Sequence, residues 1–122
     1  MPYLPKLHSP EQIERWILEI LEPKECVWVA LKCGEIVGFV SYKGEMLNHL
    51  YVLTNHQSIG IGQRLLDIAK KSSPVLRLYV FQRNKKARSF YEKRGFKLLT
   101  LSDGAGNEER EPDAFYEWRP GS

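Results

Sequence analysis

A glycine-rich loop in the middle of the chain has the residue types of a phosphate-binding turn. Residues 57–62 read Gln-Ser-Ile-Gly-Ile-Gly, follow the strand-like segment 47–53 and precede apolar residues at helical spacing. Because glycine has no Cβ, a ligand can lie against the backbone, and the first amides of a helix have no partners inside it. A phosphate would satisfy these amides and meet the positive end of the helix dipole. The alternative is a turn with only a structural task.

A second distinctive pattern follows the next predicted strand, 75–81. It runs Asn84-x-x-Ala87-x-x-Phe90-Tyr91-x-x-x-Gly95-Phe96. We expect a helix over 84–94, ended by the glycine, with an aromatic side and a largely basic, solvated side. The nearly continuous apolarity of 75–81 predicts a strand buried on both faces, which is typical of the parallel partner in a βαβ crossover.

The elements before the loop are predicted from local signals. Ser9, Pro10 and Glu11 are typical of a helix start, and apolar residues at helical spacing follow them. Two β-rich runs, 27–32 and 36–42, predict a hairpin, and a second turn at 43–45 leads into the strand before the loop. After the helix over 84–94 we expect strands at 96–101 and 113–118. The predicted fold class is therefore α/β (α+β), with a mixed, mostly antiparallel sheet around a central parallel βαβ unit.

Composition limits the class of protein. The chain has 122 residues, 43% hydrophobic and 27% charged, which predicts one globular domain over residues 1–122. No segment has the apolar length of a signal core or a membrane span, so a cytoplasmic location is expected. The net charge of +3 is too small to indicate nucleic acid by itself. Cys26 and Cys33 would lie about 20 Å apart along a strand, which excludes a disulfide, and no ligand spacing indicates a metal site.

Together the two motifs resemble those of the GCN5-related N-acetyltransferase (GNAT) superfamily. Its acetyl-CoA loop has the form Gln/Arg-x-x-Gly-x-Gly/Ala, and its next helix often carries Asn, Ala and Phe-Tyr before Gly-Phe. The resemblance covers roughly Val27 to the C-terminus. It implies a GNAT fold with a central acetyl-CoA-binding unit, acetyl-CoA as co-substrate, and transfer of the acetyl group to a primary amine of a small molecule or protein in a ternary complex.

The resemblance also implies roles for single residues. Gln57 would brace the loop, and backbone groups of Leu50, Tyr51 and Val52 would bond the pantetheine arm as an added strand, one amide holding the oxyanion. The loop amides would hold the pyrophosphate, and they belong to Ser58, Ile59, Gly60, Ile61, Gly62 and Gln63.

On the helix over 84–94, the resemblance places Asn84 at the pantetheine or at the helix cap. It places the Tyr91 hydroxyl at the thioester sulfur, as the general acid. A tyrosine pKa of about 10 lies roughly 1.5 units above that of an alkyl thiol. Full proton transfer is then uphill, so Tyr91 is expected to act mainly as a hydrogen-bond donor. The alternative is a tyrosine that only packs on an amphipathic helix.

The group that accepts the amine proton stays open. Some family members carry a glutamate where alignment of the glycine loop places Met46. Glu45 is adjacent but points to the other face unless a bulge redirects it. His49, His56 and a chain of water molecules are the other candidates, and each histidine has a packing or surface role as its alternative.

Two differences from the family's usual sequence pattern affect the predicted assembly and function. The family's usual first strand has no counterpart in Met1–His8, so the sheet is expected to lack it or to receive a strand from a partner, which makes a homodimer possible. The missing carboxylate also leaves open a coenzyme-binding regulator without activity. Gly60-Ile61-Gly62 also fits an NADP-type dinucleotide fold, and the basic helix also fits a nucleic-acid-binding module. The prediction has neither nucleic acid nor membrane as a partner.

Overall fold

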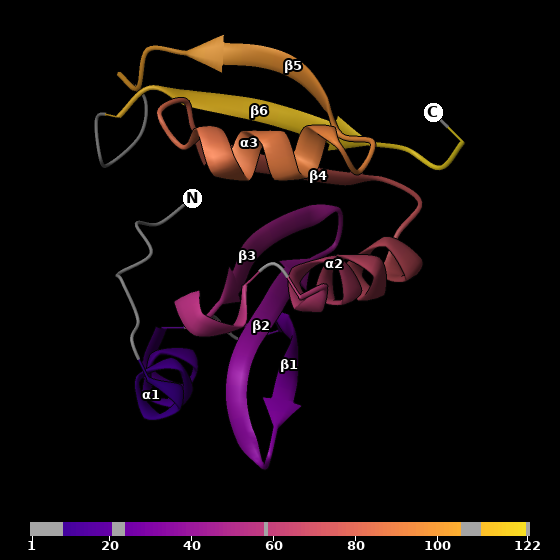
Figure 1. Cartoon of the computed structure of the whole chain (residues 1–122). Helices are drawn as coiled ribbons and strands as arrows, with labels where there is room; N and C mark the ends of the chain where they lie inside the picture. The colour runs from indigo at the N-terminus through magenta and orange to yellow at the C-terminus, as the bar shows by residue number, and fades with distance from the viewer. Residues whose placement is uncertain (1–8, 21–23, 58, 106–110, 122) are drawn as a thin grey trace. The chain divides into compact units, whose positions relative to one another are not determined.

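The computed structural model describes residues 9–20, 24–57, 59–105 and 111–121 (Figure 1). These residues form two compact units, the first ending at Ser73 and the second beginning at Pro74. Met1–His8, which lacked the family's first-strand signature, and Ser58 of the glycine loop lie outside the described residues.

The first unit begins with a capped helix. Helix α1 spans Pro10–Ile20, and the Ser9 hydroxyl accepts a hydrogen bond from the amide of Gln12 at 3.2 Å. This is the predicted cap, because a serine oxygen satisfies an amide that has no partner within the first turn. Ile13 and Trp16 are buried and attach the helix to the sheet.

Three antiparallel strands follow α1 and make the sheet of the first unit. They are β1 (Cys26–Lys32), β2 (Glu35–Lys43) and β3 (Met46–Val52), paired in that order. Cys33 and Gly34 join the first two with φ values of 52° and 81°, as a two-residue hairpin turn with the right twist requires. The predicted hairpin and the strand before the glycine loop are thus confirmed.

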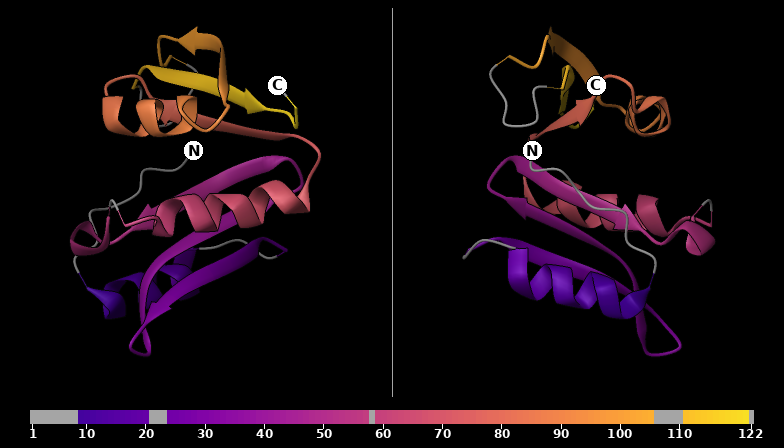
Figure 2. Two further views of the ribbon diagram at one scale, coloured as in Figure 1. Left: turned by 45° about the vertical axis from the view of Figure 1, so that its right-hand side comes forward. Right: turned by 90° about the vertical axis from the view of Figure 1, so that its left-hand side faces the viewer.

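Two helices cover opposite faces of this sheet (Figures 1 and 2). Trp16 of α1 contacts the ring of Phe39 on β2, with centroids 5.6 Å apart. Helix α2 (Ile61–Ser72) reaches the other face, where the hydroxyls of Tyr42 and Ser72 hydrogen-bond at 2.7 Å. A short 3-10 turn, η1 (Thr54–His56), lies between β3 and the glycine loop.

The second unit is also a three-stranded antiparallel sheet with a helix on one face. Its elements are β4 (Leu76–Phe81), α3 (Lys85–Glu92), β5 (Lys97–Ser102) and β6 (Asp113–Trp118). Strand β6 lies between β4 and β5. Leu78 of β4 pairs with Tyr116 of β6, and both are fully buried.

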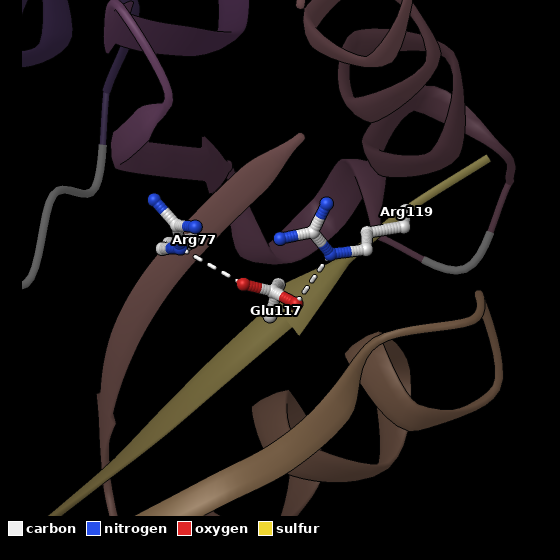
Figure 3. A network of polar contacts seen from close by, with 3 residues as sticks. All are labelled: Arg77, Glu117 and Arg119. Atoms are coloured by element: carbon white, nitrogen blue, oxygen red, sulfur yellow. Dashed lines mark hydrogen bonds and ion pairs between the residues drawn. The ribbon is translucent and has the colours of Figure 1, made fainter. Parts of the chain in front are cut away.

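The two faces of β4 differ in exposure, which corrects one expectation. Leu76, Leu78 and Val80 are buried, whereas Tyr79 is 37% exposed and Arg77 is intermediate. The face that carries Tyr79 also holds a charge network, in which Glu117 binds Arg77 at 2.9 Å and Arg119 at 2.8 Å (Figure 3). Long apolar side chains on this strand thus tolerate partial solvent contact, so the apolar run alone did not establish burial on both faces.

Candidate functional site

The start of α2 presents backbone amides that the helix itself does not use. Gly60 is the N-cap residue with a φ of 90°, and no side chain of the described residues caps this helix end. The first bond inside the helix runs from the amide of Arg64 to the carbonyl of Gly60, at 3.1 Å. The amides of Ile61, Gly62 and Gln63 therefore precede the helical ladder, at the positive end of the dipole.

Burial of one side of α2 fixes these amides in place. Leu65, Leu66 and Ala69 are buried against the sheet. Ile59, just before the helix, is 61% exposed. The helix start is thus held by its core-facing side, which leaves the amide end open to a ligand.

Gln57 connects the loop to the end of β3. Its side-chain amide donates a hydrogen bond to the carbonyl of Val52 at 2.9 Å. This geometry matches the bracing contact that the resemblance implied. It also means that the carbonyl of Val52 already has a partner within the chain.

The register of β3 defines which backbone groups are directed away from β2. The amide of Leu53 donates to the carbonyl of Val37 at 2.8 Å, so Leu53 bonds to β2. In an antiparallel ladder every second residue bonds to the same neighbouring strand, and the residues between them point their backbone groups away from it. The backbone groups of Tyr51 therefore face β2, whereas those of Leu50 and Val52 point to the opposite side. Of the three residues expected to bond pantetheine, Leu50 and Val52 have the suitable direction.

A β-bulge interrupts β3 just before these residues. Ser41 of β2 pairs with His49, and the next residue, Tyr42, pairs with Leu47, so Asn48 has no partner in the ladder. An extra residue reverses the alternation of side chains around it. Leu47 consequently lies on the α2 face with Tyr42, and His49 lies on the α1 face with Ser41.

His49 belongs to a buried polar cluster beneath α1. Its Nδ1 atom hydrogen-bonds the Ser41 hydroxyl at 2.8 Å and lies 3.7 Å from a carboxylate oxygen of Glu25. The ring of Trp16 contacts the imidazole edge-on at 4.8 Å, and Asn48 donates to Glu25 at 2.9 Å. Burial lowers the pKa of His49, and the nearby Glu25 carboxylate opposes that shift.

The other positions considered for the proton acceptor differ in how far they are buried. Glu45 is exposed in the turn before β3, and Met46 begins the strand in a partly buried position. His56 lies in η1, and its Nδ1 atom is buried with no hydrogen-bond partner among the described residues. His49 is the only one of the three charged or titratable candidates that packs inside the core.

Asn84 caps the helix of the second unit. Its side-chain oxygen accepts a hydrogen bond from the amide of Ala87 at 3.1 Å, which is one of the two roles that the resemblance allowed. The other end of α3 is at Glu92, with Lys93 as the C-cap, two residues before the predicted end; Gly95 follows with a φ of 92°, and a Cβ there would approach the Trp118 ring to 3.3 Å. Both limits of the helix thus lie near these local signals.

Tyr91 is a buried residue of α3. Its ring makes edge-on contacts with Phe90 and Phe96, each with centroids 5.3 Å apart, and only 7% of the residue is exposed. Burial raises the pKa of the Tyr91 hydroxyl. The packing role proposed as the alternative is therefore real, and it does not exclude a chemical one.

The predicted residues fall into the two units. The loop, Leu50–Val52 and His49 belong to the first, while Asn84 and Tyr91 belong to the second. One prediction about α3 was wrong: Arg88 is not on a solvated face, because it is partly buried and donates to the Tyr116 hydroxyl at 3.0 Å.

Sequence reasoning also missed the polar contacts that shape these regions. Glu25 and Asn48 gave no signal, because their contact depends on the register of the strands that bring them together. Arg88 and Glu92 are four residues apart, which is a usable sign of a shared helix face. Their common partner, Tyr116, comes from a distant strand and could not be identified from spacing.

The family of the chain follows from comparison with known proteins. The family model described as an acetyltransferase (GNAT) domain matches residues 23–98, which is more than half of the chain. The chain belongs to the GNAT acetyltransferase family. The mixed α/β fold class predicted from the sequence is confirmed by this match and by the structural neighbours.

Two curated relatives from bacteria illustrate the sequence similarity. The chain is 34% identical over 73 residues to the peptidyl-lysine N-acetyltransferase YiaC of Escherichia coli, which covers 59% of this chain and 50% of the relative. It is 32% identical over 93 residues to the peptidyl-lysine N-acetyltransferase YjaB of Salmonella typhimurium, which covers 75% and 63%. The matches thus span about half to two thirds of the length of these relatives.

Solved structures show the same fold. The apo form of YjaB from Escherichia coli superposes with a TM-score of 0.68 at 27% identity, covering 75% of this chain and 63% of that one. A streptothricin acetyltransferase assigned in Bacillus anthracis, solved with acetyl coenzyme A, gives a TM-score of 0.72 at 23% identity, covering 85% and 67%.

The described residues contain neither a cluster of metal-ligating side chains nor a helix suited to a membrane. No group of three or more histidine, cysteine or acidic side chains there has the geometry to hold a metal ion. None of the described helices has both the length and the apolar character needed to cross a membrane.

Proposed function

We propose that this chain transfers an acetyl group from acetyl-CoA to a primary amine of a small molecule or a protein. The amine nitrogen attacks the thioester carbonyl carbon in a ternary complex, the C–S bond breaks, and coenzyme A leaves as its thiol. The observation that carries the proposal is the start of α2, where the amides of Ile61, Gly62 and Gln63 precede the helical ladder and receive no side-chain cap from the part of the chain that the structure describes. These amides suit a pyrophosphate.

The strand beside the loop supports the pantetheine arm in this proposal. Leu50 and Val52 direct their backbone groups away from β2, and the Val52 carbonyl is held by Gln57. The amide of Leu50 or Val52 then donates to the carbonyl oxygen as negative charge develops on it. Ser58 and Ile59 complete the predicted loop, and Asn84 acts at the α3 cap.

Tyr91 serves as a hydrogen-bond donor to the thioester sulfur in this mechanism. A tyrosine pKa already lies about 1.5 units above that of an alkyl thiol. Burial raises the pKa of Tyr91 further, so complete proton transfer becomes still less favourable. A donated hydrogen bond stabilises the leaving thiolate without requiring that transfer.

Water is the proposed acceptor of the amine proton. The position that some relatives fill with glutamate holds Met46, which has no proton-accepting group. The Nδ1 atom of His49 is engaged with Ser41, and the ring is packed under Trp16. These contacts favour a structural role for His49 and leave a chain of water molecules as the simplest route.

The class of acceptor, the domain organisation and the cellular compartment are also proposals. The names of YiaC and YjaB describe peptidyl-lysine acetylation, so a lysine side chain is the first acceptor to test. One GNAT domain over residues 1–122 is supported by the family match, which extends across the boundary between the two units. The exposed free thiols Cys26 and Cys33 suit a reducing compartment such as the cytoplasm.

A homodimer stays a prediction with one supporting feature. Strand β1 lies at the edge of the first-unit sheet among the described residues, and it carries Trp28, Val29 and Leu31 as exposed apolar side chains. Edge strands of this kind pair readily with a second chain. Light scattering on purified protein measures the oligomeric state directly.

Binding and turnover together test the proposed function. Calorimetry with coenzyme A and acetyl-CoA measures the affinity, and release of thiol from acetyl-CoA measures transfer to lysine peptides and small amines. Both cysteines are exposed and would react with a chromogenic disulfide. The assay therefore uses the double variant Cys26→Ser, Cys33→Ser, after its melting temperature is shown to match that of the parent chain.

The outcomes distinguish an acetyltransferase from a coenzyme-binding regulator. Binding with amine-dependent thiol release supports the enzyme. Binding with no transfer to any amine supports a coenzyme-binding regulator, which the methionine at position 46 makes a specific alternative. Absence of binding to either form of the coenzyme refutes both.

A further inference from the structure

A buried phenol in the second unit is held between two charged side chains of α3. Tyr116 of β6 is fully buried, and its hydroxyl donates a hydrogen bond to the carboxylate of Glu92. The same hydroxyl accepts a hydrogen bond from Nε of Arg88 at 3.0 Å. A phenylalanine would fill this space equally well, so packing alone does not account for the hydroxyl.

The contacts of Arg88 extend this network to the other strands of the unit. A terminal nitrogen of Arg88 donates to the carbonyl of Gln82 at 3.4 Å. The side-chain amide of Gln82 donates in turn to the carbonyls of Ser102 and Asp113, at 2.8 and 2.9 Å. The helix is thereby connected through polar bonds to the end of β4, to β5 and to β6.

Tyr91 lies on the same helix as the two charged residues of this network. Arg88 precedes Tyr91 by three residues and Glu92 follows it directly, so the two groups that bind Tyr116 flank the proposed donor. The ring of Tyr91 makes apolar contacts with Phe90 and Phe96. Apolar contacts are non-directional, whereas hydrogen bonds to charged groups fix both distance and angle.

We propose that Tyr116 is a positioning residue, which acts through Arg88 and Glu92 to fix α3 on the sheet of the second unit and so to fix the position of the Tyr91 hydroxyl, the proposed donor to the thioester sulfur. This inference rests on the proposed function, because Tyr91 has its role only if acetyl-CoA binds. Catalytic groups must keep their geometry closely, and a displacement of about 1 Å can lower a rate by about 100-fold. Removal of one buried hydroxyl is thus expected to reduce catalysis without removing the site.

The variant Tyr116→Phe is expected to fold. Arg88 and Glu92 are four residues apart on α3, so they can pair with each other once the hydroxyl is gone. We expect kcat to fall about 10- to 100-fold, with the KM for acetyl-CoA changed less than about twofold. Because Tyr116 acts through Tyr91, adding Tyr116→Phe to Tyr91→Phe is expected to lower kcat no further.

Tyr42→Phe is the matched control in the first unit. Tyr42 is 6% exposed, and its hydroxyl likewise has two polar partners, Nε1 of Trp28 at 3.1 Å and the Ser72 hydroxyl at 2.7 Å. Its loss is expected to lower the melting temperature about as much as the loss of the Tyr116 hydroxyl. Its kcat is expected to stay within about twofold of the parent value.

A second measurement does not depend on turnover. In protein labelled with ¹³Cζ-tyrosine, the signal of Tyr91 is assigned by its absence in Tyr91→Phe. We expect Tyr116→Phe to shift this signal and to speed hydrogen exchange of the α3 amides, and Tyr42→Phe to do neither. Addition of coenzyme A to the parent chain tests the proposed function separately, because binding at the site is expected to move the Tyr91 signal.

The proposal is overturned if the losses in kcat of the two tyrosine variants of the second unit multiply in the double variant, or if Tyr116→Phe leaves the Tyr91 signal and the α3 exchange unchanged. An unresponsive Tyr91 signal on addition of coenzyme, together with absent turnover, refutes the proposed function instead. In that case the Tyr91 signal and the hydrogen exchange of the α3 amides still show whether Tyr116 holds α3 in position.

Discussion

Replacement of Gly60 by alanine separates a binding role of the glycine loop from a structural one. Gly60 has a φ of 90°, and a Cβ added there would meet no atom within 4 Å. The cost of alanine is therefore conformational rather than steric, about 1–2 kcal/mol for an L-residue in the left-handed region. For a chain of this size we expect a fall in melting temperature of about 3–6 °C per kcal/mol.

The effect on the coenzyme is expected to be larger than the effect on the fold. If the chain relieves the strain at Gly60, the amides of Ile61, Gly62 and Gln63 move from their present directions. Loss of one hydrogen bond to a charged group costs about 1.5–3 kcal/mol. The Kd for coenzyme A in calorimetry should then rise about 10- to 150-fold.

Gly34 provides a closely matched control. Its φ is 81°, a Cβ there also meets nothing within 4 Å, and it lies in the hairpin turn between β1 and β2. Gly34→Ala should lower the melting temperature by a similar amount and leave the Kd for coenzyme A within about twofold. If the two alanine variants bind coenzyme A equally well, the start of α2 is not the pyrophosphate site and the reasoning from the glycine loop is refuted.

Three further variants test single contacts. Tyr91→Phe should lower kcat by about one to three orders of magnitude with little change in the Kd for coenzyme A, and an unchanged kcat would remove Tyr91 from the mechanism. Asn84→Ala removes the cap on the Ala87 amide and should cost about 0.5–2 kcal/mol in denaturant unfolding, whereas an unchanged midpoint would contradict the capping role. Because burial lowers the pKa of His49, the unfolded chain takes up its proton first as the pH falls below about 6.5, and the free energy of unfolding should decrease there. His49→Gln should flatten that decrease in unfolding curves at several pH values, and an equally steep decrease would assign the effect to other groups.

Local signals in the sequence were sufficient for most element boundaries. The Ser9 and Asn84 caps were correctly placed because a capping side chain acts on an amide only three residues away. The turn at Cys33 and Gly34 is a short-range constraint of the same kind. The order of helices and strands therefore follows from short patterns of this kind, whereas the family follows from the two motifs at 57–62 and 84–96 taken together.

These local signals could not predict contacts between segments that are distant in the sequence. The basic residues of α3 were expected to face solvent, yet Arg88 is directed at the phenol of Tyr116, 28 residues further along the chain. A long cationic side chain can bury its stem and keep its charged end bonded, so its direction depends on what the fold places nearby. The same holds for Glu25, whose partner Asn48 lies 23 residues away.

The bulge at Asn48 shows why the candidates for the amine base could not be ordered by counting residues. Unbroken alternation would place Met46 on the same face of β3 as Leu50 and Val52. Because Asn48 is unpaired between Leu47 and His49, Met46 instead shares the α1 face with His49. The bulge does not bring Glu45 onto that face, since Met46 still pairs with Lys43 at the start of the strand. The α1 face near Met46 therefore receives no carboxylate from this part of β3, which agrees with water as the proposed acceptor of the amine proton.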